Sequence, residues 1–94
     1  MTPAQCRAAR GLLDWSQQQL ADAARVGIVT VRQFEAAAAK PRNSTLDVLC
    51  RAFESAGVIF LAENGEGPGV RLRKSAGARA ASIAIEDLNA ENDE

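Results

Sequence analysis

The side chains that follow Gly27 are the first candidates for chemistry in this sequence. Arg32 and Gln33 each come four residues after an aliphatic residue, Ile28 and Val29 respectively, and on a helix this spacing places both pairs on one face. A glutamine amide can bond the N6 and N7 atoms of adenine, and a guanidinium can bond guanine or a phosphate. The segment therefore favours a helix that offers hydrogen-bonding groups to a nucleic acid.

Catalysis has little support in the residue types. The sequence contains no histidine and no tyrosine, and Cys6 and Cys50 lie beside apolar residues in expected helices. The glycine-rich residues 65–69 fit a hairpin turn and follow no phosphate-loop pattern. No cluster of metal ligands occurs. We expect no enzyme activity, no cofactor and no metal site.

The cysteines and the hydropathy indicate a compartment. Cys6 and Cys50 form either a redox pair or two small buried hydrophobes of a cytosolic protein, and we adopt the second interpretation. No run of eighteen apolar residues occurs, and no signal peptide precedes Thr2. We therefore expect no membrane segment and a cytoplasmic location.

Residues 16–35 must position the candidate side chains. Ser16 and Gln19 have the spacing of a capping box, which starts one short helix. A turn at residues 25–27 leads to a second short helix, and two such helices form the unit that lays its second helix in a DNA major groove. The apolar residues expected to face inward are Leu20, Ala21, Ala24, Val31 and Phe34.

Together with the residues before it, this stretch resembles the Cro/C1-type (Xre-like) helix-turn-helix family of phage repressors and bacterial regulators. The matching positions, whose joint spacing is diagnostic over residues 3–56, are Arg10, Ser16, Gln17, Leu20, Ala21, Val26, Val31, Glu35 and Pro41. The resemblance implies a mainly α, lambda-repressor-like four-helix DNA-binding domain. It also implies a pair between Arg10 and Glu35 that ties the first helix to the end of the third; the alternative is two unrelated surface charges.

The resemblance assigns the DNA contacts residue by residue. Gln17 would meet the phosphate backbone at a helix N-terminus, where the helix dipole favours anions. The positions that would reach base edges are Gly27, Ile28, Val29, Arg32 and Gln33, and further phosphate candidates in the loop before the fourth helix are Lys40, Arg42 and Asn43. The implied function is a sequence-specific regulator that binds a two-fold operator on double-stranded DNA as a homodimer.

Ile28 and Val29 leave three interpretations open, because they cannot hydrogen-bond a base. They can contact thymine methyl groups, join the core, or belong to a protein-binding face. The third interpretation corresponds to an alternative function, a protein-interaction module of antitoxin-like or antiactivator type that keeps the fold and binds a second protein.

Several residues depart from the family pattern. Asp14 and Arg25 stand where the family usually has glycine, and residues 36–39 are four alanines where a glycine usually ends the recognition helix. Alanine is a strong helix former, so we expect this helix to continue for about one turn, until Lys40 and Pro41 stop it. The fourth helix should be capped by Ser44 or Asn43 and end at Gly57, with an inward stripe of Leu46, Leu49, Cys50 and Phe53.

The residues after Gly57 change from helical to strand character. Residues 58–62 are β-branched and apolar, residues 70–73 alternate with period two, and turn residues lie between them. This predicts a β-hairpin over 58–74 in one compact unit with the helical domain of residues 1–57. An isolated hairpin is marginal in water, so we expect it to dimerise through Val58, Phe60, Val70 and Leu72.

The charges divide the chain into a basic body and an acidic tail. Residues 1–74 carry ten Lys and Arg against seven Asp and Glu, whereas residues 75–94 carry Arg79 against five acids. The net charge of −1 thus conceals a body suited to nucleic acid. The tail is either a solubilising, disordered end or a weak helix that docks on a partner through Ala81, Ile85 and Leu88.

Overall fold

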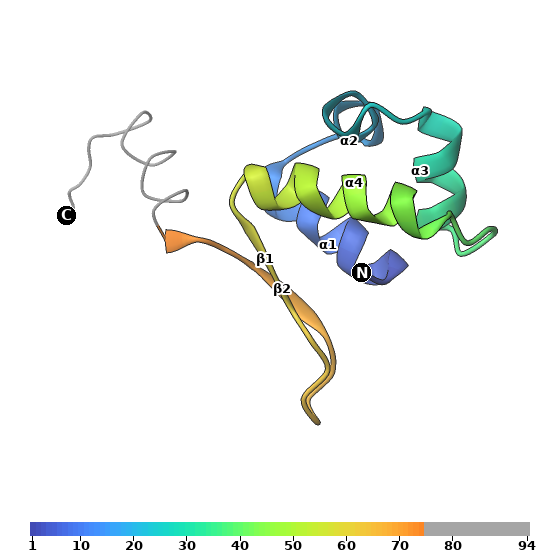
Figure 1. The fold of residues 1–94 in the computed structure, drawn as a ribbon. Coiled ribbons are helices and arrows are strands. Elements are labelled where there is room, and N and C mark those ends of the chain that lie inside the picture. Colours follow the sequence, from blue (N-terminus) through green and yellow to red (C-terminus); the bar gives the residue numbers. More distant parts are fainter. Residues whose placement is uncertain (75–94) are drawn as a thin grey trace, which may run out of the picture.

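The computed structural model describes residues 1–74 and contains four helices followed by a two-stranded hairpin (Figure 1). The elements are α1 (Pro3–Leu13), α2 (Gln17–Ala24), α3 (Ile28–Glu35), α4 (Asn43–Ser55), β1 (Val58–Leu61) and β2 (Gly69–Leu72). This order confirms the predicted fold class. The expectations for the acidic tail lie outside the described residues. Within residues 1–74, no helix is long and apolar enough to cross a membrane.

The first two helices begin with the predicted capping boxes. Thr2 Oγ1 accepts from the backbone N–H of Gln5 at 3.0 Å, and Ser16 Oγ accepts from the backbone N–H of Gln19 at 3.0 Å. In return, each glutamine side chain accepts from the backbone N–H of its N-cap residue. The expected cap of α4 is wrong. That helix begins one residue earlier, with Arg42 at the N-cap and no capping bond from any side chain of residues 1–74.

Each of the first three helices is followed within two residues by a non-glycine residue in the left-handed conformation. Asp14, Arg25 and Ala37 have φ values of 57°, 58° and 57°. At the end of α3, the Ala37 amide bonds the Phe34 carbonyl at 3.0 Å and the Ala38 amide bonds the Gln33 carbonyl at 2.9 Å. This is the Schellman arrangement. The predicted alanine extension of α3 is therefore wrong, because the chain reverses at Ala37 and the helix ends at Glu35.

The core contains the apolar residues that the helical periodicity predicted to face inward. Leu20, Ala21, Ala24, Val31 and Phe34 are buried, together with Cys6, Ala9, Leu49, Phe53 and Val58. An aromatic row crosses the core. Trp15 stacks on Phe53 with ring centroids 5.8 Å apart, and Phe60 meets the other side of the row edge-on at 5.9 Å. The row joins the α1–α2 connection, α4 and the hairpin into one core.

The hairpin packs one face on the helices. Val58 pairs with Leu72 and Phe60 with Val70, and directly opposed residues share a face of an antiparallel pair. These four residues pack in or against the core. Val58 is fully buried there and has no surface for a second chain, so its assignment to a dimer interface is wrong.

Gln5 fastens the hairpin to α1. Its Nε2 donates to the Leu61 carbonyl at 3.2 Å and to the Gly69 carbonyl at 3.0 Å, near the end of the strand pair that leads into the turn. The same side chain caps α1 through its Oε1. One buried amide therefore serves both the start of the first helix and the seating of the hairpin.

We predict opposite effects of the same substitution at two neighbouring alanines. Ala37→Gly should raise the free energy of unfolding by about 0.5–1 kcal/mol, because glycine adopts positive φ without steric cost. Ala36→Gly should lower it by about 0.5–1 kcal/mol, because Ala36 has φ −82° and glycine gains only unfolded-state entropy there. Urea unfolding of both variants measures the difference. Equal effects would contradict the left-handed stop at residue 37.

Candidate nucleic-acid interface

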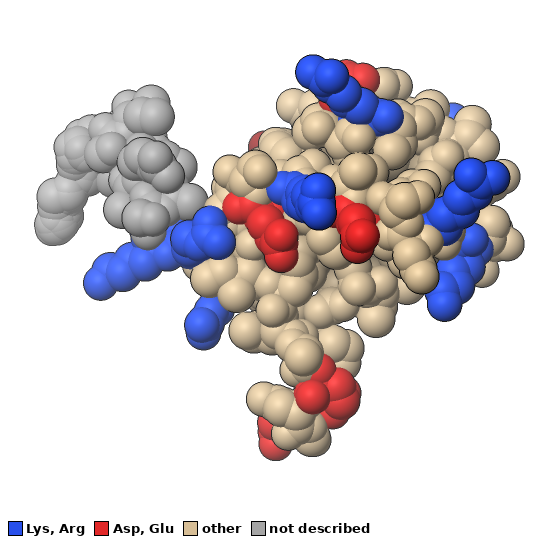
Figure 2. Space-filling view, viewed as in Figure 1, with Lys and Arg blue, Asp and Glu red and all other residues tan. Residues whose placement is uncertain are grey.

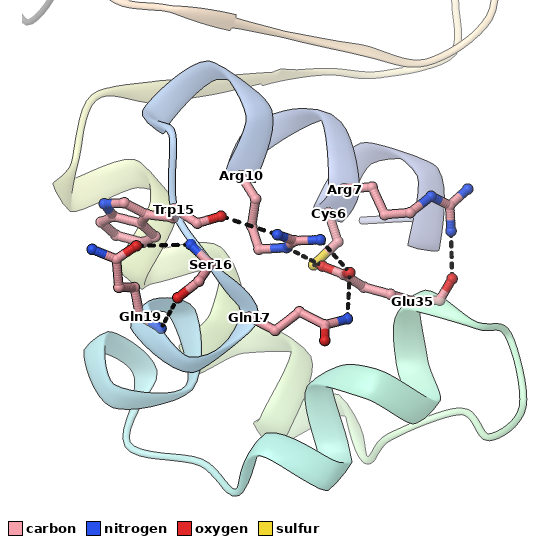
Figure 3. A network of polar contacts seen from close by, with 8 residues as sticks. All are labelled: Cys6, Arg7, Arg10, Trp15, Ser16, Gln17, Gln19 and Glu35. Atoms are coloured by element: carbon pink, nitrogen blue, oxygen red, sulfur yellow. Dashed lines mark hydrogen bonds and ion pairs between the residues drawn. The ribbon is translucent and has the colours of Figure 1, made fainter.

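The carboxylate of Glu35 is the centre of a polar network between α1, the start of α2 and the end of α3 (Figure 3). Arg10 binds it with two parallel bonds, Nε to Oε2 and Nη2 to Oε1, each 2.7 Å long. A third bond, from Arg10 Nη1 to the Trp15 carbonyl at 3.0 Å, fixes the guanidinium against the α1–α2 connection. The geometry confirms the pairing of Arg10 with Glu35. It also joins α1 to the last residue of α3.

Three further side chains donate to Glu35. Gln17 Nε2 reaches Oε1 at 3.0 Å, and the Cys6 thiol reaches Oε2 at 3.1 Å. Arg7 donates to the Glu35 main-chain carbonyl, which has no partner inside the helix because it lies in the last turn. The end of α3 is thus held by side chains from α1 and α2 rather than by a glycine.

The network sets the ionisation of its members. Burial opposes the charge on Glu35, which is 5% exposed, but the bonds from Arg10, Gln17 and Cys6 outweigh it and hold the pKa of Glu35 below its ordinary value. Burial, reinforced by Glu35, raises the pKa of the Cys6 thiol far above its ordinary value. Both cysteines are free. Cys6 is therefore a buried neutral donor, whereas Cys50 is only partly buried.

The exposed surface of α3 carries most of the predicted base-reading residues. Arg32 and Gln33 are exposed, and Val29 is 56% exposed. Ile28 is only half-buried and packs partly against the core. The two aliphatic residues thus have different surroundings: Ile28 packs partly against the core, and Val29 points toward solvent. Gly27, the N-cap of α3, is exposed.

A polar cleft beside α3 brings other predicted residues together. It has a volume of about 370 Å³ and is lined by Gln33 together with Lys40 and Arg42 from the loop between α3 and α4. Thr30 and Thr45 also line it and were missed in the sequence. Their signal was available, since Thr30 precedes Gln33 by three residues and Thr45 follows Arg42 by three. Asn43 is exposed at the first position of α4, outside the lining of the cleft.

Basic side chains lie at both ends of this side of the molecule. Figure 2 shows Lys and Arg side chains at the end formed by the α3–α4 loop, at the opposite end where β2 terminates, and over α4 between two acidic patches; further acidic side chains lie at the tip of the hairpin. Lys40 and Arg42 are exposed. Lys40 and Arg42 therefore place positive charge beside the exposed face of α3.

Comparison with known families identifies the class of this domain. The family model described as helix-turn-helix matches residues 7–56. The match covers more than half of the chain, and the protein belongs to this family of Cro/C1-type helix-turn-helix proteins, a family of DNA-binding regulatory domains. Comparison with curated proteins finds no match.

We predict that Glu35→Gln destabilises the protein by about 3 kcal/mol at pH 7, since it leaves the Arg10 guanidinium without its counter-charge; this is the lower end of the range for buried pairs because Arg10 is still 20% exposed. Glu54→Gln, an exposed change on α4, should have little effect.

The same variant has a pH signature. The pKa of Glu35 is lowered by folding, so its contribution is fully present above the unfolded value of about 4.3 and is lost as pH falls through the lower folded value. The stability advantage of the native protein over Glu35→Gln should therefore shrink as pH falls below about 4. Thermal unfolding from pH 7 to pH 3 measures it, and a constant difference would contradict the assigned ionisation.

Proposed function

We propose that this protein is a sequence-specific transcriptional regulator that binds an operator on double-stranded DNA as a homodimer. The observation that carries the proposal is the cleft in which Gln33 of α3 lies with Lys40 and Arg42. A base-reading amide and two phosphate-binding cations at one edge fit a helix lying in a major groove with its flanking loop on the backbone.

The α3–α4 loop and the start of α4 supply the phosphate contacts in this proposal. Arg42 occupies the N-cap of a 13-residue helix, and no side chain of residues 1–74 bonds the cap. The first backbone amides of α4 are therefore open to an anion, and the helix dipole favours negative charge there. Lys40, Arg42 and Asn43 add side-chain donors to the same surface.

Gln17 has a defined role in this proposal. One of its two amide hydrogens is engaged by Glu35, while the second hydrogen and the carbonyl oxygen are available to other partners. The bond to Glu35 holds the amide at the N-terminus of α2, so Gln17 would meet a phosphate in a fixed orientation. Arg10 and Glu35 are then positioning residues for a DNA contact.

The exposed face of α3 would read the bases. Gln33 can pair with adenine, Arg32 can bond guanine or a phosphate, and the Val29 side chain can contact a thymine methyl group. At Gly27, a Cβ would meet no atom of residues 1–74 within 4 Å apart from its chain neighbours. Packing inside the described chain therefore does not require glycine, which leaves room for a close approach of DNA to the start of α3.

The homodimer is proposed from the hairpin and from the size of one reading helix. α3 has only eight residues, and two-fold operators present half-sites about 34 Å apart. The hairpin turns Leu61, 37% exposed, and Ile59 away from the face that packs on the core. Strand edges that are exposed and apolar favour pairing with another chain. We propose that the dimer contacts include these two residues, on the hairpin face opposite the partly buried Phe60, Val70 and Leu72.

Val29 favours a second candidate function, a protein-interaction module that keeps this fold and binds a second protein. An aliphatic side chain that is 56% exposed in the middle of the reading face suits a protein surface as well as a thymine methyl group. A salt titration separates the two functions, because phosphate contacts give a steep fall of affinity with salt and an apolar protein contact does not.

We predict different losses for two single substitutions in the cleft. On an operator selected from random DNA, Gln33→Ala should cost about 1–3 kcal/mol and relax the preference at one base pair. Arg42→Ala should weaken all sequences alike and reduce the salt slope by about one unit. Arg51→Ala, a charge-matched control on α4 outside the cleft, should leave both quantities unchanged. Unchanged operator and random-DNA binding in Gln33→Ala would show that α3 does not lie in the groove as proposed.

We predict that the native protein sediments as a dimer at micromolar concentration and that Leu61→Glu converts it to a monomer with weakened operator binding. A carboxylate at this position would be buried between two hairpins, which is costly without a partner. Leu12→Glu is the matched control, because Leu12 is a similarly exposed leucine (40%) on α1. A native monomer that binds the operator fully at high micromolar concentration would refute the dimer.

A further inference from the structure

A groove between α2 and α4 is not used by the proposed DNA interface. It has a volume of about 470 Å³. Trp15 lines it together with small or aliphatic side chains such as Ala23, Val48 and Ala52. Val48 is 37% exposed. Because the alanine side chains are small, larger aliphatic side chains of another segment can pack between the two helices.

The two charged residues in the lining of this groove are both arginines. Arg25 at the end of α2 and Arg51 on α4 are exposed. Among residues 1–74, the one ion pair is that of Arg10 with Glu35, so neither guanidinium has a carboxylate within 4.0 Å there. The α4 acids Asp47 and Glu54 stay outside the lining. The groove therefore suits an aliphatic segment that also carries acidic side chains.

The chain leaves the described structure beside this groove. The Arg73 amide donates to the Gly57 carbonyl at 2.7 Å, and Arg73 Nη1 donates to the Glu54 carbonyl at 3.3 Å. Ser55 and Ala56, between these two acceptors in sequence, line the groove. Figure 1 shows β2 ending on the side of the molecule where α4 ends. Residues 75–94 thus begin next to the C-terminal end of the groove.

The sequence of residues 75–94 has the matching chemistry. Ile85 and Leu88 are three residues apart, a spacing that places both on one face of a helical turn. Glu86 and Asp87 lie between them. Residues 75–83 can span about 30 Å when extended, whereas the stretch of α4 from Val48 to Ser55 measures about 10 Å. The segment can therefore reach every part of the groove.

We propose that residues 83–88 of the same chain occupy the α2–α4 groove. Ile85 and Leu88 pack against Trp15 and the alanines of the groove, and Glu86 and Asp87 face Arg25 and Arg51. A tether of this length holds the segment at an effective concentration in the millimolar range, which favours it over a free partner. The segment buries the exposed Val48 and neutralises both guanidiniums. This inference does not rest on the proposed DNA binding.

Trp15 reports on the occupant directly, because it is the only tryptophan and the sequence has no tyrosine. In the full chain, replacing Ile85 and Leu88 together by aspartate should shift the Trp15 emission to longer wavelength and increase its quenching by acrylamide. Replacing Ser82 and Asn92 together by aspartate adds the same charge but keeps both aliphatic residues, so this control should fluoresce as the native protein does.

A charge exchange tests the orientation in the same assay. Arg51→Glu should expose Trp15 to acrylamide, and combining it with Glu86→Lys and Asp87→Lys should restore the protection. Quenching that is the same in the native chain and in the Ile85→Asp, Leu88→Asp variant would overturn the proposal. So would protection that grows with protein concentration, since the occupant would then be a second copy, and so would a charge exchange that restores nothing.

Discussion

The bidentate pair between Arg10 and Glu35 is the interaction on which the rest of the structure depends. Glu35 lies at the last position of α3 and is almost completely removed from water. A carboxylate in that position is tolerated only if its oxygens are bonded, and Arg10, Gln17 and Cys6 together supply four bonds. Because these donors come from α1 and α2, the orientation of α3 is fixed relative to both helices through one side chain.

The local signals of the sequence predicted the elements well. Both capping boxes, the inward stripes of α2 and α3, and the hairpin follow from spacings of two to four residues, and such spacings express helix and strand geometry directly. The pair of Arg10 with Glu35, by contrast, joins residues 25 positions apart. Only its family resemblance predicted it, because no local periodicity encodes such a contact.

The errors arose where a tertiary contact overrode a local preference. Alanine propensity favoured a longer α3, but Arg7 and Arg10 hold its last residue and the chain reverses at Ala37. The period-two pattern of the hairpin identified which residues share a face. It could not tell whether that face meets the chain's own helices or a second chain, and Val58 was misassigned for this reason. The cleft of Gln33, Lys40 and Arg42 likewise needs the turn at Ala37 to form, so its residues could be named but not brought together.

Gln5 gives the hairpin a set angle to the helices. Its amide holds the strand pair by two carbonyls, 56 and 64 positions away in the sequence, while its other end belongs to the rigid first turn of α1. If two chains join through their hairpins, the angle between each hairpin and its helices determines how far apart the two α3 helices lie. The distance between the two α3 helices is then set by the hydrogen bonds of Gln5 to the hairpin. The spacing of operator half-sites that the protein accepts would then depend on Gln5, a residue outside the proposed DNA contacts.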